Sequence, residues 1–440
     1  MGSVNLFSLA LPLLFEHVVN NLLGFVSSAF LSSYSQSAVA AVGSASSVIS
    51  AVSVVLTVLA NGAAVTVSNY IGANDPEGAS KSCRAALTAG IASGALVSLI
   101  SALFAGEIMG LMNLEAEALE MATAYFRIRM SFFFVQVTSG VLSAMLRCFG
   151  YPGPTVFSGL LTVSVNLLLS VWVIKLPEYC PLTGIEGIAA ACVVSQLAGL
   201  VSNLIFTRLR RVRYPRPRSL GENLTFVRRV LRIGIPTGLT GMAYSVSQTV
   251  TTAFIGVIGT YAVSAKVYYS NILMWAYLFS VCFGTANSYL VGRLAGAGDY
   301  DRADRLNRRL TRLTRAVNLS LSLVIILLRR PLVGIFTADE RILSACLAVF
   351  IVDAAAEQAR ATSQVYEYAL RGAGDMKFMM AVVTLSCWIL GVGLSWLLAV
   401  PAGMGILGCW IGMAADECVR AAASYARWKS GIWKNADPTR

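Results

Sequence analysis

Long apolar runs recur along this 440-residue chain and constrain its fold more than any other feature. A run of about 20 apolar residues predicts a helix that can cross a bilayer, because a helix satisfies its own backbone hydrogen bonds there. Hydrophobic residues make up 56% of the sequence and charged residues only 13%, which is not the balance of a soluble protein of this size. Twelve such runs are present: 6–31, 43–70, 85–106, 117–146, 154–175, 184–207, 233–258, 263–291, 316–336, 342–369, 378–400 and 404–424. We therefore predict an all-α polytopic membrane protein with twelve transmembrane helices.

Basic residues are distributed unevenly among the segments between these runs, although the formal net charge is +12. They crowd into alternate loops, above all 208–232 and 293–315, and are sparse in the loops between them. This positive-inside pattern predicts a multi-pass protein of the cell (inner or plasma) membrane with both termini in the cytoplasm. The excess of positive charge then reflects topology and contact with lipid, so we expect the bilayer and no nucleic acid as a partner.

The second half of the chain repeats motifs of the first at an offset of 224 residues. The matching elements begin at Pro12 and Pro236, at Ala38 and Ala262, and at Leu146 and Leu370. With a slight drift, the segment 71–75 corresponds to Val291-Gly292 and to the segment 296–299. Six spans in each repeat give the halves the same orientation, which predicts two pseudo-symmetric six-helix lobes around a central cavity.

The same reading divides the chain into four parts. We expect an N-terminal lobe at 1–207, a basic cytoplasmic linker at 208–232, a C-terminal lobe at 233–428 and a cytoplasmic tail at 429–440. Pro and charge in the linker are typical of an exposed connection rather than of a span.

One apolar run, from Ser344 to Gly372, carries polar residues at regular spacing. Intervals of 4, 3, 4 and 3 place them on one helical face, within a fan of roughly 80°: Asp353, Glu357, Arg360, Gln364 and Glu367. Ionised groups in hydrocarbon cost several kcal/mol each, so this stripe is expected to line a wet cavity that serves transport or ion coupling. The alternative is a Glu357–Arg360 pair that only locks two helices together.

Asp353 and Glu357 are the first candidates for ion coupling. They are one turn apart, and two carboxylates so close cannot both ionise at low cost, so one would hold a proton or share Na⁺. Glu367 and Glu16 are further candidates. We expect H⁺ or Na⁺ as the coupling ion and no other cofactor. We also expect no metal centre, because the sequence has a single histidine and no Cys-x-x-Cys.

Polar and aromatic side chains of several runs are candidates for a substrate cavity. They combine hydrogen-bonding groups with adaptable apolar surface, as a site for varied organic molecules requires: Arg360, Gln364, Asn20, Tyr244, Gln248, Lys266 and Trp275. For each of them packing is the alternative, since Ser, Thr and amide groups join helices in membranes and aromatic rings contact lipid. The buried cations also leave a zwitterionic or anionic substrate open.

Short motifs in both halves occur in the order found in one transporter family, and the chain resembles the multidrug and toxic compound extrusion (MATE) family over nearly its whole length. They include Ala38-Val-Ala-Ala-Val-Gly, Tyr70-Ile-Gly-Ala-Asn-Asp, Gly184-Ile-Glu-Gly, Leu290-Val-Gly-Arg and Ala369-Leu-Arg-Gly-Ala-Gly-Asp375. The resemblance implies two six-helix lobes, a V-shaped central cavity, and efflux of organic molecules, usually cations, driven by inward Na⁺ or H⁺. Two acids that relatives carry are absent, since Ser27 and Tyr244 stand at their positions.

We therefore expect a secondary active antiporter that acts as a monomer and is not an enzyme. It would export small organic molecules of the multidrug type in exchange for H⁺ or Na⁺ by alternating access. Two alternatives are a flippase for a lipid-linked precursor and a non-transporting membrane scaffold or sensor.

Overall fold

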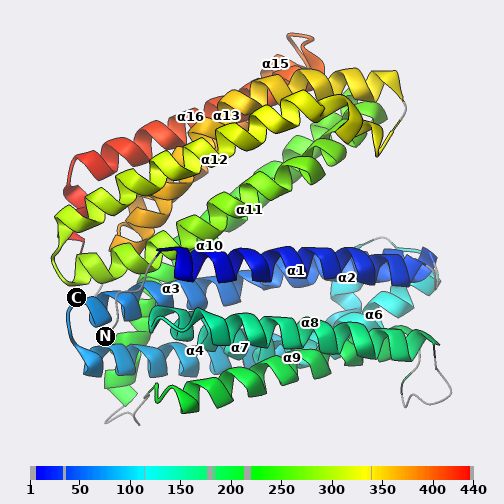
Figure 1. Cartoon of the computed structure of the whole chain (residues 1–440). Coiled ribbons are helices and arrows are strands. Elements are labelled where there is room, and N and C mark those ends of the chain that lie inside the picture. Colours follow the sequence, from blue (N-terminus) through cyan, green and yellow to red (C-terminus); the bar gives the residue numbers. More distant parts are fainter. Residues whose placement is uncertain are drawn as a thin grey trace. The chain divides into compact units, whose positions relative to one another are not determined.

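The computed structural model of the chain consists of helices joined by short loops (Figure 1). It describes residues 6–32, 36–112, 114–175, 182, 184–212, 220–337 and 339–436, without the side chains of 20, 22–32, 36, 39–40, 220 and 260. The described residues contain no strand. Each of the twelve apolar runs is occupied by one helix or by consecutive helices.

Most of these helices have the length and composition of membrane spans. Among the described residues, eight are long and apolar enough to cross a bilayer, and a bent pair makes nine. That pair is α6 (Ala116–Ser131) and α7 (Phe133–Cys148), which meet at 48°. The helix α16 (Gly405–Lys429) is outside this set, and three charged residues interrupt its apolar sequence: Asp416, Glu417 and Arg420.

The chain separates into two compact units. Unit 1 comprises Met1–Val67 and Asp75–Ile235, and unit 2 comprises Ser68–Asn74 and Pro236–Arg440. The helices of unit 1, besides α6 and α7, are α1 (Leu6–Ser32), α2 (Gln36–Val52), most of α3 (Val54–Gly72), α4 (Pro76–Leu103), α5 (Ala105–Gly110), α8 (Pro152–Lys175), α9 (Gly184–Leu209) and the first turns of α10 (Leu220–Ile258). Within it α8 packs against α9 and α1, α4 packs against α7, and α2 packs against α6.

Unit 2 is built around one central helix. Its remaining elements are α11 (Thr260–Gly296), α12 (Tyr300–Gly334), α13 (Glu340–Ala373), α14 (Met376–Ser386), the π-helix η2 (Cys387–Leu394), α15 (Ser395–Ala399), α16 and the 3₁₀ turn η3 (Ile432–Asn435). The helix α13 contacts α11, α12 and α16, so most of its circumference is covered. Aromatic rings fill one part of this core, where Tyr269 lies 5.3 Å from Phe350 and 4.8 Å from Trp410 between ring centroids.

The duplication is visible in the backbone. Left-handed φ angles occur at Asn74 (56°) and Gly298 (71°), and at Gly150 (86°) and Gly374 (87°), pairs that are each 224 residues apart. The next residues, Asp75 and Asp299, both cap helices, because their carboxylates accept the N–H groups of Gly78 and Arg302. The offset therefore holds without the drift expected between segments 71–75 and 296–299.

Two of the expected single spans contain breaks. The run 43–70 is interrupted at Ser53, whose hydroxyl donates to the Ile49 carbonyl, a local bond that disturbs helices. The run 117–146 bends at Phe132, and the Phe134 N–H that is freed there donates to Ser98 Oγ on α4 at 3.2 Å. Hydropathy does not detect such breaks, because both halves of each span are apolar.

The helix ends also differ from the expected domain limits. The first turns of α10, from Leu220, lie inside the range expected as linker, and 213–219 are outside the described residues. Within the expected tail, Trp433 stacks on Trp428 at 4.0 Å, so the 3₁₀ turn is packed against α16.

Candidate functional site

The polar stripe of α13 lies inside unit 2. The run contains no Gly or Pro until Gly372, and Gly374 ends the helix in a left-handed conformation. Asp353 is 2% exposed and Glu357 0%, and Gln364 and Glu367 are also buried. Arg360 is the accessible member, with 17% of its side chain exposed. The wet cavity that the stripe was expected to line remains a prediction.

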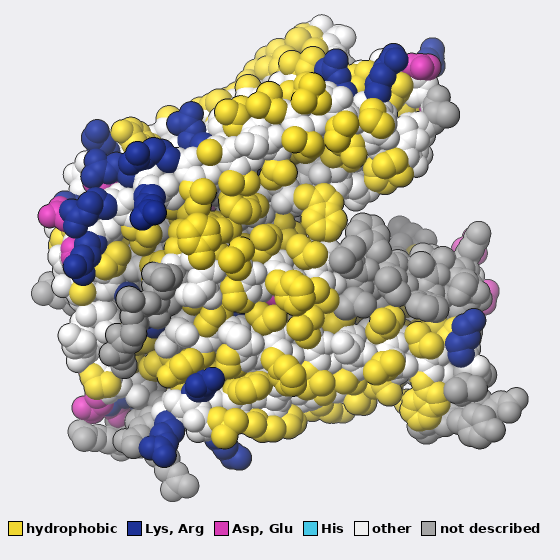
Figure 2. Space-filling model, in the orientation of Figure 1, with side chains coloured by type: hydrophobic (Ala, Val, Ile, Leu, Met, Phe, Trp, Pro, Cys, Tyr) yellow, Lys and Arg dark blue, Asp and Glu magenta, His cyan; other side chains and the backbone are white. Residues whose placement is uncertain are grey.

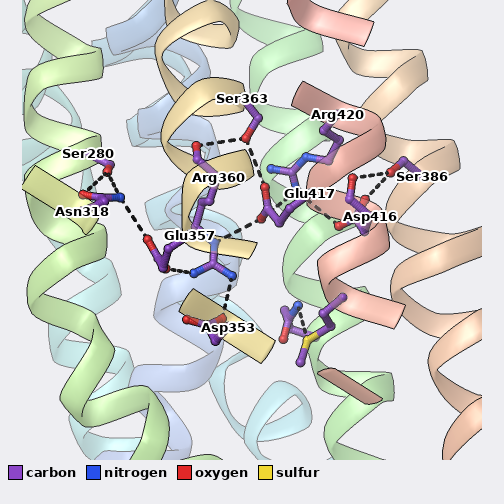
Figure 3. A network of polar contacts seen from close by, with 12 residues as sticks. Ser280, Asn318, Asp353, Glu357, Arg360, Ser363, Ser386, Asp416, Glu417 and Arg420 are labelled. Carbon is purple, nitrogen blue, oxygen red and sulfur yellow. Dashed lines mark hydrogen bonds and ion pairs between the residues drawn. The ribbon is translucent and has the colours of Figure 1, made fainter. Parts of the chain in front are cut away.

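The Arg360 guanidinium joins three carboxylates (Figure 3). It bonds Glu357 one turn away, Asp353 Oδ1 at 3.5 Å, and Glu417 Oε1 of α16 at 3.3 Å. The three carboxylates converge because 3- and 4-residue spacing brings two of them together on α13, while α16 packs against the same face. No hydrogen bond of normal geometry reaches Asp353 Oδ2 within the described residues.

A second guanidinium extends this arrangement along α16. Arg420 Nη1 lies 3.5 Å from Asp416 Oδ2 and 3.7 Å from Glu417 Oε1. Asp416 also accepts a hydrogen bond from the Ser386 hydroxyl of α14. Arg420 lies over the Tyr244 ring of α10, 5.5 Å from its centroid, which is close enough for a cation–π contact.

Neutral donors supply further hydrogen bonds to the carboxylates. Asn318 Nδ2 of α12 donates to Glu357 Oε2 at 2.9 Å and to Ser280 Oγ of α11 at 3.1 Å. Ser363 Oγ donates to Glu417 Oε2 at 3.1 Å. Helices α11, α12, α13, α14 and α16 thus meet at one polar centre (Figure 3).

We call the six charged residues of this centre the acid network. It consists of four carboxylates and two guanidinium groups: Asp353, Glu357, Asp416, Glu417, Arg360 and Arg420. If every member were ionised, the network would carry two uncompensated negative charges in a buried site. Such charge is costly to bury, so the arrangement is suited to bind protons or a small cation.

Two of the predicted ion-coupling residues lie apart from this network. Glu367 pairs with Arg371 one turn further along α13, at 3.3 Å. Glu16 belongs to unit 1, where Arg147 of α7 approaches it at 3.1 Å. Its carboxylate also packs against Gly159 of α8. A Cβ added to Gly159 would lie 3.3 Å from Glu16 Oε1. Glu16 therefore joins α1 to α7 and α8.

Two of the predicted cavity residues, Lys266 and Gln248, form a second polar group in unit 2. Lys266 of α11 donates to Thr252 Oγ1 at 2.7 Å and lies 3.5 Å from Gln248 Oε1, both on α10. Among the described residues it has no carboxylate within ion-pair distance. Trp275 is exposed on α11. The side chain of Asn20 is outside the described residues.

The sequence analysis missed the α16 half of the acid network. Asp416, Glu417 and Arg420 stand in an otherwise apolar run at spacings of 3 and 4, the same signal that singled out α13. Asn318, Ser280 and Ser386 gave no such signal, because single neutral polar residues are common in membrane helices. The described residues contain no group of three or more His, Cys, Asp or Glu that could hold a metal ion.

Comparison with known proteins identifies the family. The sequence model of the MatE family matches residues 12–172 and 236–397. The chain belongs to the MatE family of multidrug and toxic compound extrusion transporters. It is 26% identical to "Uncharacterized transporter YisQ" of Bacillus subtilis (strain 168), with 98% of this chain and 94% of that protein covered. It is 27% identical to "Probable multidrug resistance protein NorM" of Thermotoga maritima, with coverage of 98% and 92%.

The fold is shared with solved MATE structures. A MOP superfamily transporter from Pyrococcus furiosus Vc1 (DSM3638) matches with a TM-score of 0.86 at 18% identity, covering 97% of this chain and 95% of that one. The all-α architecture with pseudo-symmetric lobes expected from the sequence is thereby confirmed. The MatE assignment makes this chain a multi-pass membrane transporter of the toxic-compound efflux type.

Proposed function

We propose that this MatE transporter is a secondary active antiporter in which the acid network of unit 2 binds the coupling ion, H⁺ or Na⁺. It would act as a monomer in the cell membrane, with both termini in the cytoplasm, and export a small organic molecule by alternating access. The observation that carries the proposal is the excess of two buried carboxylates over guanidinium groups. An ion that neutralises this excess is released when another positive charge replaces it.

Asp353 is the carboxylate best suited to exchange its ion. Glu357 and Glu417 each accept a hydrogen bond from a neutral donor in addition to Arg360. Within the described residues, Asp353 accepts one hydrogen bond, from Arg360 at 3.5 Å, and the Tyr269 hydroxyl lies beside its carboxylate. Its Oδ2 is buried without a hydrogen bond of normal geometry in the described part of the chain. Binding of a proton or Na⁺ there would stabilise this oxygen and weaken the hold of Asp353 on Arg360.

The substrate would bind near the accessible face of Arg360 and the Lys266–Gln248 group. A cation would compete with the coupling ion for the network's negative charge, which supports the cationic substrates expected for the family. Lys266 has no acidic partner in ion-pair range among the described residues, so an anionic group is the second candidate ligand. The Pyrococcus furiosus transporter is described as having a binding pocket of reverse polarity that suggests a different function, so both charges need testing.

The test is ion-driven transport in proteoliposomes. Vesicles holding the purified protein would be given a pH gradient or a Na⁺ gradient, and uptake of cationic, zwitterionic and anionic dyes would be followed by fluorescence. One of the two gradients is expected to drive uptake, which identifies the ion. Asp353→Asn is expected to abolish gradient-driven uptake, while Glu340→Gln, an exposed acid on the same helix, leaves it unchanged.

Glu16 provides the discriminating comparison. If Glu16→Gln abolished coupling while D353N and a D353N/E357Q double variant still concentrated dye against the gradient, the ion site would belong to unit 1 and the proposal would be wrong. If the rate of dye uptake by the unaltered protein depended on neither the pH gradient nor the Na⁺ gradient, antiport by either ion would be excluded.

A further inference from the structure

A groove of about 670 Å³ lies in unit 2, and none of the six charged residues of the acid network lines it. It runs between α12, α13 and α16 and is lined by three arginines, by Gln358, Thr362, Tyr366 and Tyr425, and by small side chains between them. The arginines are Arg308, Arg312 and Arg315 of α12. Figure 2 shows Lys and Arg side chains gathered over the beginning of this helix.

The charges of these arginines are largely unneutralised. Arg308 pairs with Asp304 at 2.7 Å, but Arg312 and Arg315 have no acidic partner within ion-pair distance among the described residues. Both are exposed. A pocket that presents two such guanidinium groups a turn apart is complementary to an anion, and it repels the organic cations that the family exports.

The same face of α12 changes from basic to apolar within one turn. Leu319 and Leu323 follow Arg315 at intervals of 4. At 100° per residue, the three arginines of the groove and these two leucines fall within a fan of roughly 80°. Leu319 is 47% exposed and Leu323 is 52% exposed. A stripe that passes from exposed arginine to exposed leucine marks the boundary between lipid headgroups and acyl chains.

We propose that this groove binds an anionic phospholipid of the cytoplasmic leaflet. Its phosphate lies between Arg312 and Arg315, which can each donate two parallel hydrogen bonds to phosphate oxygens. One acyl chain follows Leu319 and Leu323. A free phosphate would leave that apolar surface without a contact, whereas a lipid covers it. Anionic lipids are present in the cytoplasmic leaflet, which is the side on which the basic loops of the chain are expected.

The bound lipid connects the groove to the acid network through α13. Gln358 and Thr362 line the groove, while their neighbours Glu357 and Ser363, each about 100° further around the helix, bond within the polar centre. A lipid seated against α12, α13 and α16 therefore holds together three helices that carry the network. This predicts that the lipid raises the thermal stability of the folded protein, whether or not the proposed ion coupling is correct.

The experiment is a thermal-unfolding titration of the full-length protein in a mild non-ionic detergent. The probes are dioctanoyl phosphatidylglycerol, dioctanoyl phosphatidylcholine and inorganic phosphate. Phosphatidylglycerol is expected to raise the unfolding temperature in a saturable manner, and the other two are expected to have little effect. In R312Q/R315Q the half-saturating concentration should rise about tenfold or more, since two charge-assisted contacts are lost. The single variants should give intermediate values.

The matched control is R305Q/R309Q, which removes the same charge from exposed positions of the same helix that do not line the groove. It should bind phosphatidylglycerol as the unaltered protein does. Equal weakening in both double variants would reduce the effect to bulk charge and overturn the site. Stabilisation by inorganic phosphate alone, or equally by phosphatidylcholine, would replace the anionic lipid with a free anion or with a purely apolar ligand.

Discussion

Arg360 determines the electrostatics of the polar centre. Among the residues that the structure describes, it alone bonds carboxylates from both α13 and α16: Asp353, Glu357 and Glu417. A guanidinium offers five N–H donors in a fixed plane, which lysine cannot reproduce. The three acids can therefore lie close together only while Arg360 is present or while protons or cations replace its charge.

Arg360→Met is expected to destabilise the protein strongly. The methionine keeps much of the side-chain volume but leaves Asp353 and Glu357 without their cation and Glu417 with Arg420 alone. Breaking such a buried pair costs about 3–5 kcal/mol. Thermal unfolding in detergent would measure the loss, and Arg341→Met, an exposed arginine of the same helix, should leave the unfolding temperature unchanged. Equal unfolding temperatures for the two variants would show that the acids are already neutralised by other means.

Two substitutions of Asn318 are expected to destabilise the protein with different pH dependence. Asn318→Leu removes the amide donor of Glu357 Oε2 and should cost about 1–3 kcal/mol, the penalty of an unsatisfied buried group. Asn318→Asp adds a carboxylate beside Glu357, so its unfolding temperature should fall at alkaline pH and recover as the medium is acidified. N318L should show no such recovery. If the unfolding temperature of N318D did not depend on pH, the introduced carboxylate and Glu357 would not repel each other in the folded protein.

At the scale of helices, the spacing of polar residues predicted which side chains share a helical face. It did not predict which other helices that face contacts. The spacing of Asp353, Glu357 and Arg360 placed them on one face of α13 correctly, because that geometry depends only on neighbouring residues. Their bonds to Glu417 and Asn318 join segments about 40 to 60 residues apart, and nothing in the local sequence encodes such a contact. The early start of α10 at Leu220 was missed for a related reason, since its first turns are too charged to register as a span.

The end of α3 meets α11 at a contact that tolerates only glycine. A Cβ at Gly72 would lie 2.0 Å from the Arg293 carbonyl oxygen, and one at Gly296 would lie 2.0 Å from that of Asn69. These two contacts are related by the offset of 224, so the duplicated motifs touch each other symmetrically within unit 2. The close approach explains why both repeats place glycine there.

Gly72→Ala is therefore expected to separate these helices. Overpacking costs typically about 1–3 kcal/mol, and a clash with rigid backbone belongs at the upper end of that range. Gly241→Ala of α10 is the control, because no atom lies within 4 Å of its Cβ position. It should be neutral or stabilise by about 0.5–1 kcal/mol, since alanine favours the helix. Similar unfolding temperatures for G72A and G241A would mean that the α3–α11 contact opens without loss of stability.

Over the whole molecule, the two repeats share backbone features and helix caps, but only the second repeat carries the carboxylates of the acid network. Both keep the helix caps at Asp75 and Asp299 and an arginine at Arg147 and Arg371. The first-half positions equivalent to the four acids of the network hold no carboxylate: Arg129, Phe133, Cys192 and Val193. The duplication thus predicted the architecture well, whereas the acid network is present in one repeat only and could not be predicted by symmetry.

The charged helix α16 gives the last prediction, since composition alone does not class it as a membrane span. It can cross because Asp416, Glu417 and Arg420 are paired inside unit 2 rather than exposed to lipid. Its C-terminal flank carries Arg427, Lys429 and Lys434, which should hold that end in the cytoplasm. A fusion of green fluorescent protein after Ser430 should therefore fluoresce, and alkaline phosphatase fused after Gly403 should be active outside.

Only α16 separates the two fusion sites. If both reporters were found on the same side of the membrane, α16 would not cross it. The chain would then have an odd number of spans, and the expected cytoplasmic position of both termini would be wrong.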